Sequence, residues 1–249
     1  LDVSAGAFFD RAGNPCREQL GINITEFGDD IKPVVISADI RLSDGMLKVE
    51  LSEILDLTPI SYLDITKMKL SNTDHATDFG TPNQIPLDGA RIVNATFETY
   101  TGFDPSIAGK VDLIDDSKFI YLVLNESQRV RAIELSGTPG GDGAALKLDV
   151  LEGAFRDIAQ NKNIDLLATT VTETADDVPP VLVSSTVFLS DGMIHVLGSE
   201  TIDVTPASKV DLSLIQLRND QNTGTTPWDQ ILWLSGHESG DASVTTEVD

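Results

Sequence analysis

The chain contains a long internal repeat, and this feature constrains its fold more than any other. Residues 1–72 match residues 148–219 at 32 of 72 positions without a gap. Ser43-Asp44-Gly45-Met46 returns as Ser190-Asp191-Gly192-Met193, so equivalent residues lie 147 positions apart (191 − 44 = 147). A period of this length corresponds to a whole domain rather than to one turn of a solenoid. We therefore expect domains of about 147 residues that share one fold.

The repeat divides the chain into three expected parts. Residues 1–29 form the C-terminal tail of a preceding repeat, residues 30–176 a complete repeat, and residues 177–249 the N-terminal half of the next. This division is typical of a segment from a longer array, and a complete unit is long enough to bury its own core. The last part has no equivalent of residues 118–173, so alone it is expected to expose apolar faces and strand edges.

Short alternating strands are expected throughout the complete repeat. Val34, Ile36, Ala38 and Ile40 alternate with other residues, and Ser43-Asp44-Gly45 is a hairpin signal. Further strands are expected at 47–51, 63–70 with a bulge, 90–96, 118–124 as a central strand, 146–150 and 166–173, and a short helix capped by Ser127 is expected at 127–134. This pattern predicts an all-β antiparallel β-sandwich with Greek-key connections.

Two motifs carry a resemblance to a known family. Residues 33–53, with Pro-Val-Val-Ile-Ser and then Leu-Ser-Asp-Gly-Met-Leu-Lys-Val-Glu-Leu-Ser-Glu, precede a closing Gly-Ala-Phe-x-Asp-x-Ala-x-Asn from Gly153 to Asn161. The chain thereby resembles the immunoglobulin-like (Ig-like) repeats of bacterial S-layer and adhesin proteins and of large secreted surface proteins of algae and protists. The resemblance implies tandem Ig-like β-sandwiches at a cell surface, and such modules serve as stalks, adhesive tips or accessory domains.

The charge of the chain limits its partners. A net charge of −23 argues against nucleic acids and against anionic membrane surfaces, because both attract Lys and Arg, and it favours cations. No run of about 18 apolar residues is present, so no membrane insertion of this segment is expected. Cys16 is the only cysteine and its counterpart is Asn163, so no disulfide forms within these residues.

Acidic residues are expected to gather at the junctions between repeats. In an Ig-like sandwich, the loop after the second strand and the loop before the last strand lie at the end where the N-terminal linker enters. Six oxygen-bearing side chains then meet there, and Ca²⁺ takes six to eight oxygen ligands: Asp29, Asp30, Glu53, Asp56, Asp157 and Asn161. The repeat reproduces four of them as Asp176, Asp177, Glu200 and Asp203. The alternative is that each residue only caps a turn, as Asp and Asn often do.

Other candidate sites are weaker. Asn23, Asn94 and Asn125 begin N-glycosylation sequons, which favour a secreted protein. His75, His195 and His237 are far apart in the sequence, and the glycine-rich residues 136–143 have no phosphate-binding Lys-Ser/Thr ending, so no enzyme is expected. Trp228 and Trp233 have no Trp counterparts in the first copy; they belong to the core or stack on a sugar.

These observations lead to one expectation and two alternatives. The first is a structural extracellular repeat protein that forms the shaft or layer of a filament, appendage or surface coat, with calcium at its junctions and neighbouring repeats or subunits as partners. The second is an adhesin that binds glycans or proteins through its loops. The third is a non-catalytic module of a secreted hydrolase.

Overall fold

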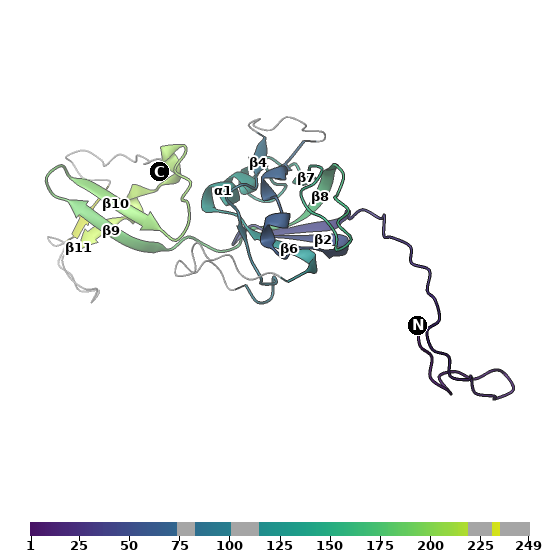
Figure 1. Ribbon diagram of the computed structural model, residues 1–249. Helices are drawn as coiled ribbons and strands as arrows, with labels where there is room; N and C mark the ends of the chain where they lie inside the picture. The colour runs from purple at the N-terminus through teal and green to yellow at the C-terminus, as the bar shows by residue number, and fades with distance from the viewer. Residues whose placement is uncertain (74–82, 101–114, 219–230, 235–249) are drawn as a thin grey trace. The chain divides into compact units, whose positions relative to one another are not determined.

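The computed structural model describes residues 1–73, 83–100, 115–218 and 231–234 (Figure 1). The chain divides into two compact units, Leu1–Asp177 and Val178–Asp249. Strands form most of the regular structure in both units, as the sequence predicts.

The first unit forms one eight-stranded sheet among its described residues. The sheet order is β4-β3-β7-β8-β1-β2-β6-β5, and every neighbouring pair is antiparallel except β8 and β1. The elements are β1 (Val35–Arg41), β2 (Met46–Leu55), η1 (Ile60–Tyr62), η2 (Ile65–Lys67), β3 (Met68–Ser71), β4 (Gln84–Pro86), β5 (Arg91–Ile92), β6 (Ser117–Val123), α1 (Glu126–Glu134), β7 (Lys147–Val150) and β8 (Leu166–Thr174).

Strand β8 joins the two halves of this sheet. Its residues up to Thr170 pair with β7, and its residues from Val171 onward pair in parallel with β1. The change occurs between Thr170 and Val171, close to Ala168, whose φ is +57° and whose N–H donates to Asp149 Oδ1 at 2.6 Å. The sheet is therefore continuous and curled, which differs from the expected pair of separate sheets, because one bent strand pairs on both sides.

The core of the first unit is apolar with one charged pair inside it. Alternate residues of the strands are buried, as the period-two pattern predicts; they include Ala38, Ile40, Leu47, Val49, Leu51, Leu70, Leu122, Leu148 and Val150. Lys69 and Asp149 face each other on β3 and β7, each 0 % exposed, with Nζ 4.0 Å from Oδ2. Asp149 also accepts from the N–H of Ala168 and the hydroxyl of Ser71, so this buried carboxylate has several partners.

Two local elements differ from the sequence expectation. The expected strand 63–70 begins as the 3₁₀ helix η2, whose N-cap Asp64 accepts from the N–H of Thr66, and only Met68–Ser71 is extended. The side chain of Asp64 binds a backbone N–H that would otherwise be available for strand pairing. The expected helix is present as α1, but it is capped by Asn125 rather than Ser127 through a capping box with Gln128.

The expected strands 90–96 and 118–124 are changed in length and place. The first is reduced to the two-residue strand β5 (Arg91–Ile92), and β6 lies between β2 and β5 near one edge of the sheet. The prediction of a central strand was wrong. The unbroken apolar run reflects burial of Ile120, Leu122 and Val123, which a strand next to the edge can also have.

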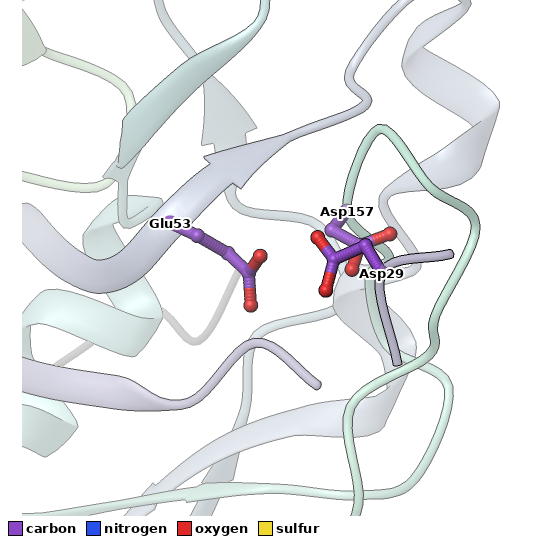
Figure 2. Close-up of side chains that lie close together, drawn as sticks. All are labelled: Asp29, Glu53 and Asp157. Atoms are coloured by element: carbon purple, nitrogen blue, oxygen red, sulfur yellow. The ribbon is translucent and has the colours of Figure 1, made fainter. Parts of the chain in front are cut away.

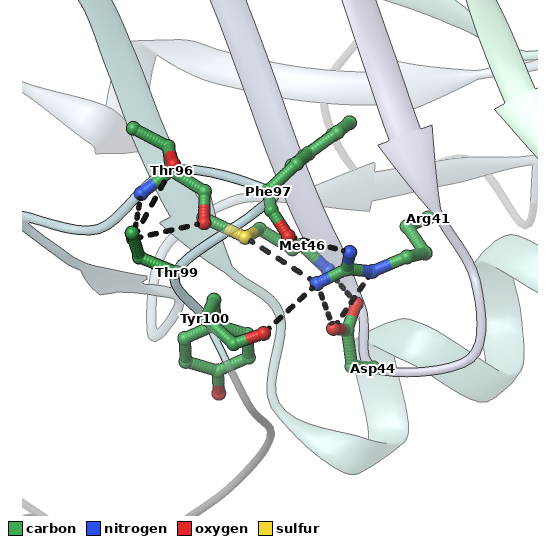
Figure 3. A network of polar contacts seen from close by, with 7 residues as sticks. All are labelled: Arg41, Asp44, Met46, Thr96, Phe97, Thr99 and Tyr100. Atoms are coloured by element: carbon green, nitrogen blue, oxygen red, sulfur yellow. Dashed lines mark hydrogen bonds and ion pairs between the residues drawn. The ribbon is translucent and has the colours of Figure 1, made fainter.

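The turn between β1 and β2 is fixed by side chains (Figure 3). Asp44 accepts from the N–H of Met46 at 3.1 Å and from Arg41 Nε at 2.9 Å, while Gly45 has φ of +70°. Arg41 also donates to the carbonyl oxygens of Phe97 and Tyr100, at 2.8 and 3.4 Å. The hairpin signal in the sequence is thereby confirmed, and Arg41 holds the segment that follows β5.

The described part of the second unit repeats several backbone elements of the first. Strand β9 and the helices η4 and η5 begin and end 147 residues after β1, η1 and η2, as β12 does after β4. The described residues form two separate two-stranded sheets, β10-β9 and β11-β12. The elements are β9 (Leu182–Phe188), β10 (Met193–Gly198), η4 (Ala207–Lys209), η5 (Leu212–Leu214), β11 (Gln216–Arg218) and β12 (Ile231–Trp233).

Candidate metal centre

Three carboxylates from separate parts of the first unit lie close together (Figure 2). Glu53 lies on β2, Asp157 lies in the turn before β8, and Asp29 lies in the linker before β1. One oxygen from each lies within 4.8 Å of the others. Two oxygens bound to one Ca²⁺ at about 2.3 to 2.6 Å can be up to about 5 Å apart. The spacing therefore fits a single cation.

The turn from Asp157 to Asn161 holds this group in place. The backbone N–H of Asn161 donates to Asp157 Oδ1 and its amide Nδ2 to Asp157 Oδ2, both at 2.8 Å. The same Nδ2 donates to the carbonyl oxygen of Asp29 at 3.1 Å. Leu55 forms a β-bridge with Asp157, which brings β2 to the same place. Asn161 thus connects the linker to the turn through its amide nitrogen, and not through the oxygen that was expected as a metal ligand.

The charges of this group oppose one another. The pKa of Glu53 is raised above its usual value, chiefly because the carboxyl is removed from water and also because the negative charges of Asp157 and Asp29 are near. Its Oε1 is buried and has no hydrogen-bond partner in the described part of the chain. A cation would offset both the desolvation and the repulsion, because it attracts the ionised form.

Asp56 and Asp30 are not members of the group of three. Asp56 Oδ2 accepts from Arg156 Nε at 3.0 Å and from its terminal nitrogen at 2.8 Å, so its charge is already compensated. Asp30 is exposed and does not belong to the group of three. The structure thus brings together three of the five expected carboxylates, with Asn161 beside them.

The repeated acidic residues have different surroundings. Asp176, the counterpart of Asp29, accepts from Arg129 at 2.7 Å, and Asp177 is exposed in the same unit. Glu200 and Asp203 belong to the second unit, where Asp203 forms an exposed ion pair with Lys209. Within the described residues of either unit, these four do not form a second group like the first.

Three basic residues pair with acidic ones and were not identified as important from the sequence. Arg129 is 5 % exposed and binds Glu126, Asp176 and the carbonyl oxygen of Leu42. Arg156 holds Asp56, and its guanidinium lies 3.4 Å from the ring centre of Tyr62. Lys69 compensates Asp149 in the core. Arg129 lies outside the repeated region and has no equivalent residue in this chain. The residues equivalent to Arg156 and Lys69 are Phe9 and Gln216, and neither is basic.

The remaining candidates give no catalytic arrangement that can be described. His75, His237 and Trp228 lie outside the described residues, and His195 lies on β10 beside Phe188. Asn23, Asn94 and Asn125 are exposed, but Asn125 uses its side-chain oxygen to cap α1. The sulfur of Cys16 donates to the carbonyl oxygen of Ser4, as Asn163 does to Leu151.

Comparisons with protein-family models, with curated proteins and with solved structures find no match. Among the described residues, the helices are too short or too polar to cross a membrane.

Proposed function

We propose that this chain belongs to a structural extracellular protein built from tandem Ig-like β-units, with Ca²⁺ bound where a linker enters a unit. The supporting observation is the triad of Asp29, Glu53 and Asp157, which joins linker, sheet and turn within 4.8 Å. An ion bound there would tie the entering linker to the unit and limit bending at the junction. A shaft or surface layer needs such stiffness between its modules.

The repeat supports the structural part of this proposal. The tail, the first unit and the second unit share turns, and single hydrogen bonds of these turns recur. The backbone N–H of Asn14 donates to Asp10 at 2.9 Å, and the backbone N–H of Asn161 donates to Asp157 at 2.8 Å. In an Ig-like arrangement, β8 would be the strand that passes from one half of a curled sandwich to the other. Arrays of such units build long assemblies without any catalytic site.

Thermal unfolding in calcium and in chelator tests the metal. A ligand that binds only the folded state adds about 2.7 kcal/mol of stability at a hundredfold excess over its Kd. We expect the first unit to melt at a higher temperature in millimolar Ca²⁺ than in chelator, and Glu53→Gln to abolish the difference. Glu50→Gln on the same strand is the matched control and should keep it. Equal curves for the unmodified chain in calcium and chelator would refute the calcium junction.

A second candidate function is adhesion to a glycan. The observation that favours it is a pocket beside β6 whose lining includes Asn94, Asp116, Phe119 and Tyr121. Aromatic rings next to polar groups suit the faces and hydroxyls of a sugar. If this surface binds a glycan, Tyr121→Ala should reduce retention on immobilised glycans, and equal retention of both proteins would argue against it. No described feature favours a role as a hydrolase module.

A further inference from the structure

The first and last strands of the eight-stranded sheet are direct neighbours and run in the same direction. Strand β1 begins at Val35, strand β8 ends at Thr174, and four residue pairs join them in parallel, from Ala38 with Val171 to Arg41 with Thr174. The start of β1 and the end of β8 therefore lie at opposite ends of the pair. The chain enters the sheet at one end of this pair and leaves it at the other.

This arrangement decides how the first unit responds to tension along the chain. A pull on the segments before β1 and after β8 draws the two strands in opposite directions along their common axis. The hydrogen bonds of a parallel pair are evenly spaced, so this shear loads them together. A pull that separates the strands from one end would instead break the bonds one after another. Bonds that must break together resist a larger force than bonds that break in sequence.

Both strands are also held on their other sides. Strand β1 pairs with β2 along its length, and β8 pairs with β7 through its residues up to Thr170. Ala38, Ile40 and Val171 are at most 2 % exposed. Extraction of β1 would therefore break two ladders and bring buried apolar side chains into water in the same step, which is unfavourable.

The exit from β8 is fastened to the end of β1 by Arg129 of α1. The N–H of Leu42 donates to the carbonyl oxygen of Thr174 at 2.9 Å. One nitrogen of Arg129 donates both to the carbonyl oxygen of Leu42 at 3.0 Å and to Asp176 Oδ2 at 2.7 Å. Arg129 is 5 % exposed, and hydrogen bonds between charged groups are stronger than neutral ones. A pull on the linker at Asp176 thus reaches β1 through this side chain as well as β8 through the backbone.

We propose that the paired segments of β1 and β8, together with Arg129, form a shear clamp that lets the first unit bear tension between the parts of the chain on either side of it. This load-bearing function deepens the proposed structural role and rests on it, but it does not rest on calcium. Forced unfolding is governed by the barrier to unfolding. The clamp raises that barrier for one direction of pull.

Single-molecule stretching of the 249-residue chain in chelator tests the clamp by changing the direction of pull. In a Cys16→Ser background, handles attached through Lys32→Cys and Asp177→Cys shear the pair from opposite ends. The attached positions are exposed. The stretched segment has 145 residues (177 − 32 = 145), and its fully extended length of about 480 to 520 Å identifies the event.

The matched geometry moves one handle to the end at which the other is attached. Lys162→Cys replaces Asp177→Cys, because Lys162 is exposed and its neighbour Asn161 donates to the carbonyl oxygen of Asp29 in the entering linker. Handles at Lys32→Cys and Lys162→Cys peel the two strands apart from one end. We expect a severalfold higher unfolding force for the shear pull than for the peel pull at the same pulling speed.

Arg129→Gln tests the contribution of the side chain at the exit. It should lower the force of the shear pull and leave that of the peel pull unchanged, because only the shear pull acts through Asp176. Arg131→Gln is the matched control and should leave both forces unchanged, since Arg131 pairs with Glu134 at the surface of the same helix.

Equal forces in the two geometries would overturn the clamp, and a loss of equal size in both geometries for Arg129→Gln would overturn the role of Arg129 in it. The comparison of geometries changes no core residue, so it decides the proposal even where Arg129→Gln does not fold. The calcium junction fails separately. Equal melting curves in calcium and chelator with a higher shear force would refute the metal alone, and a melting difference with equal forces would refute the clamp alone.

Discussion

Strands β1 and β2 with their turn, and strands β9 and β10 with theirs, have related sequences and the same local structure but different burial. Asp44 and Asp191 each accept from the N–H two residues later, at 3.1 and 3.0 Å. Leu42 is 0 % exposed, however, and its counterpart Leu189 is 92 % exposed. The hydrogen bonds of the turn are thus present in both copies, whereas in the described part of the chain only the first copy has a core of buried side chains.

This difference separates two kinds of information in one sequence. A turn is specified by residues within a few positions, because Asp supplies the acceptor and Gly the positive φ. A core requires segments that are distant in the sequence, here β6, β7 and β8 packed against β1 and β2. Equivalent residues are therefore expected to contribute differently to the free energy of unfolding in the two units. Substitutions at equivalent positions can measure this difference.

The largest difference is expected at Lys69, whose counterpart is Gln216. Lys69→Met leaves the carboxylate of Asp149 buried without its charge partner, and removing one member of a buried pair costs about 3 to 5 kcal/mol. Chemical denaturation of the first unit measures this cost. The double variant Lys69→Met with Asp149→Asn should recover part of the loss, and an unchanged midpoint for the single variant would show that the pair contributes no stability.

The next difference compares Leu42→Ala with Leu189→Ala. The first removes a fully buried side chain and is expected to cost about 2 to 5 kcal/mol, whereas the second should change stability by less than about 0.5 kcal/mol. Urea denaturation of each variant against the unmodified chain gives both values, and equal effects would mean that Leu189 is covered in solution.

Much of the fold was predictable because its signals are local or periodic. The period-two pattern located β1, β2, β7 and β8, and the hairpin signal located the first turn. The single curled sheet was not predictable, because it depends on the bend of β8 at Ala168, a residue whose type gives no sign of a positive φ. The counterpart Gly21 carries that signal only once the repeat is aligned.

The candidate site was predictable in part for the same reason. Asp29, Glu53 and Asp157 could be placed at one end from the expected order of strands. Asp56 could not be excluded, because its partner Arg156 is 100 positions away in the sequence and corresponds to Phe9 in the repeat. An Arg or Lys that pairs with a carboxylate competes with a cation for its charge, and such pairing is a tertiary property.

A smaller difference is expected between two ion pairs whose acidic members, Asp56 and Asp203, are equivalent in the repeat. Arg156 pairs with Asp56 at 17 to 22 % exposure and covers Tyr62, whereas Lys209 pairs with Asp203 at 49 to 62 % exposure. Exposed pairs contribute little, because water and salt screen them. Arg156→Gln should therefore lower the denaturation midpoint more than Lys209→Gln does, and 1 M salt should reduce the effect of Lys209→Gln first. Equal shifts would indicate that exposure does not separate the two pairs.

The smallest effect concerns the pH dependence that Glu53 gives to the first unit. Its pKa is raised in the folded protein, so between the unfolded and folded values the folded state binds more protons than the unfolded state. Stability is then expected to fall as pH rises through this window, and Glu53→Gln should remove that slope. Saturating Ca²⁺ should also remove it, because the ion favours the ionised carboxyl.

Melting of both proteins from pH 4 upward in chelator measures the slope, with Glu50→Gln as the control. A slope that persists in Glu53→Gln would assign the titration to another carboxyl and leave the repulsion among Asp29, Glu53 and Asp157 without thermodynamic effect.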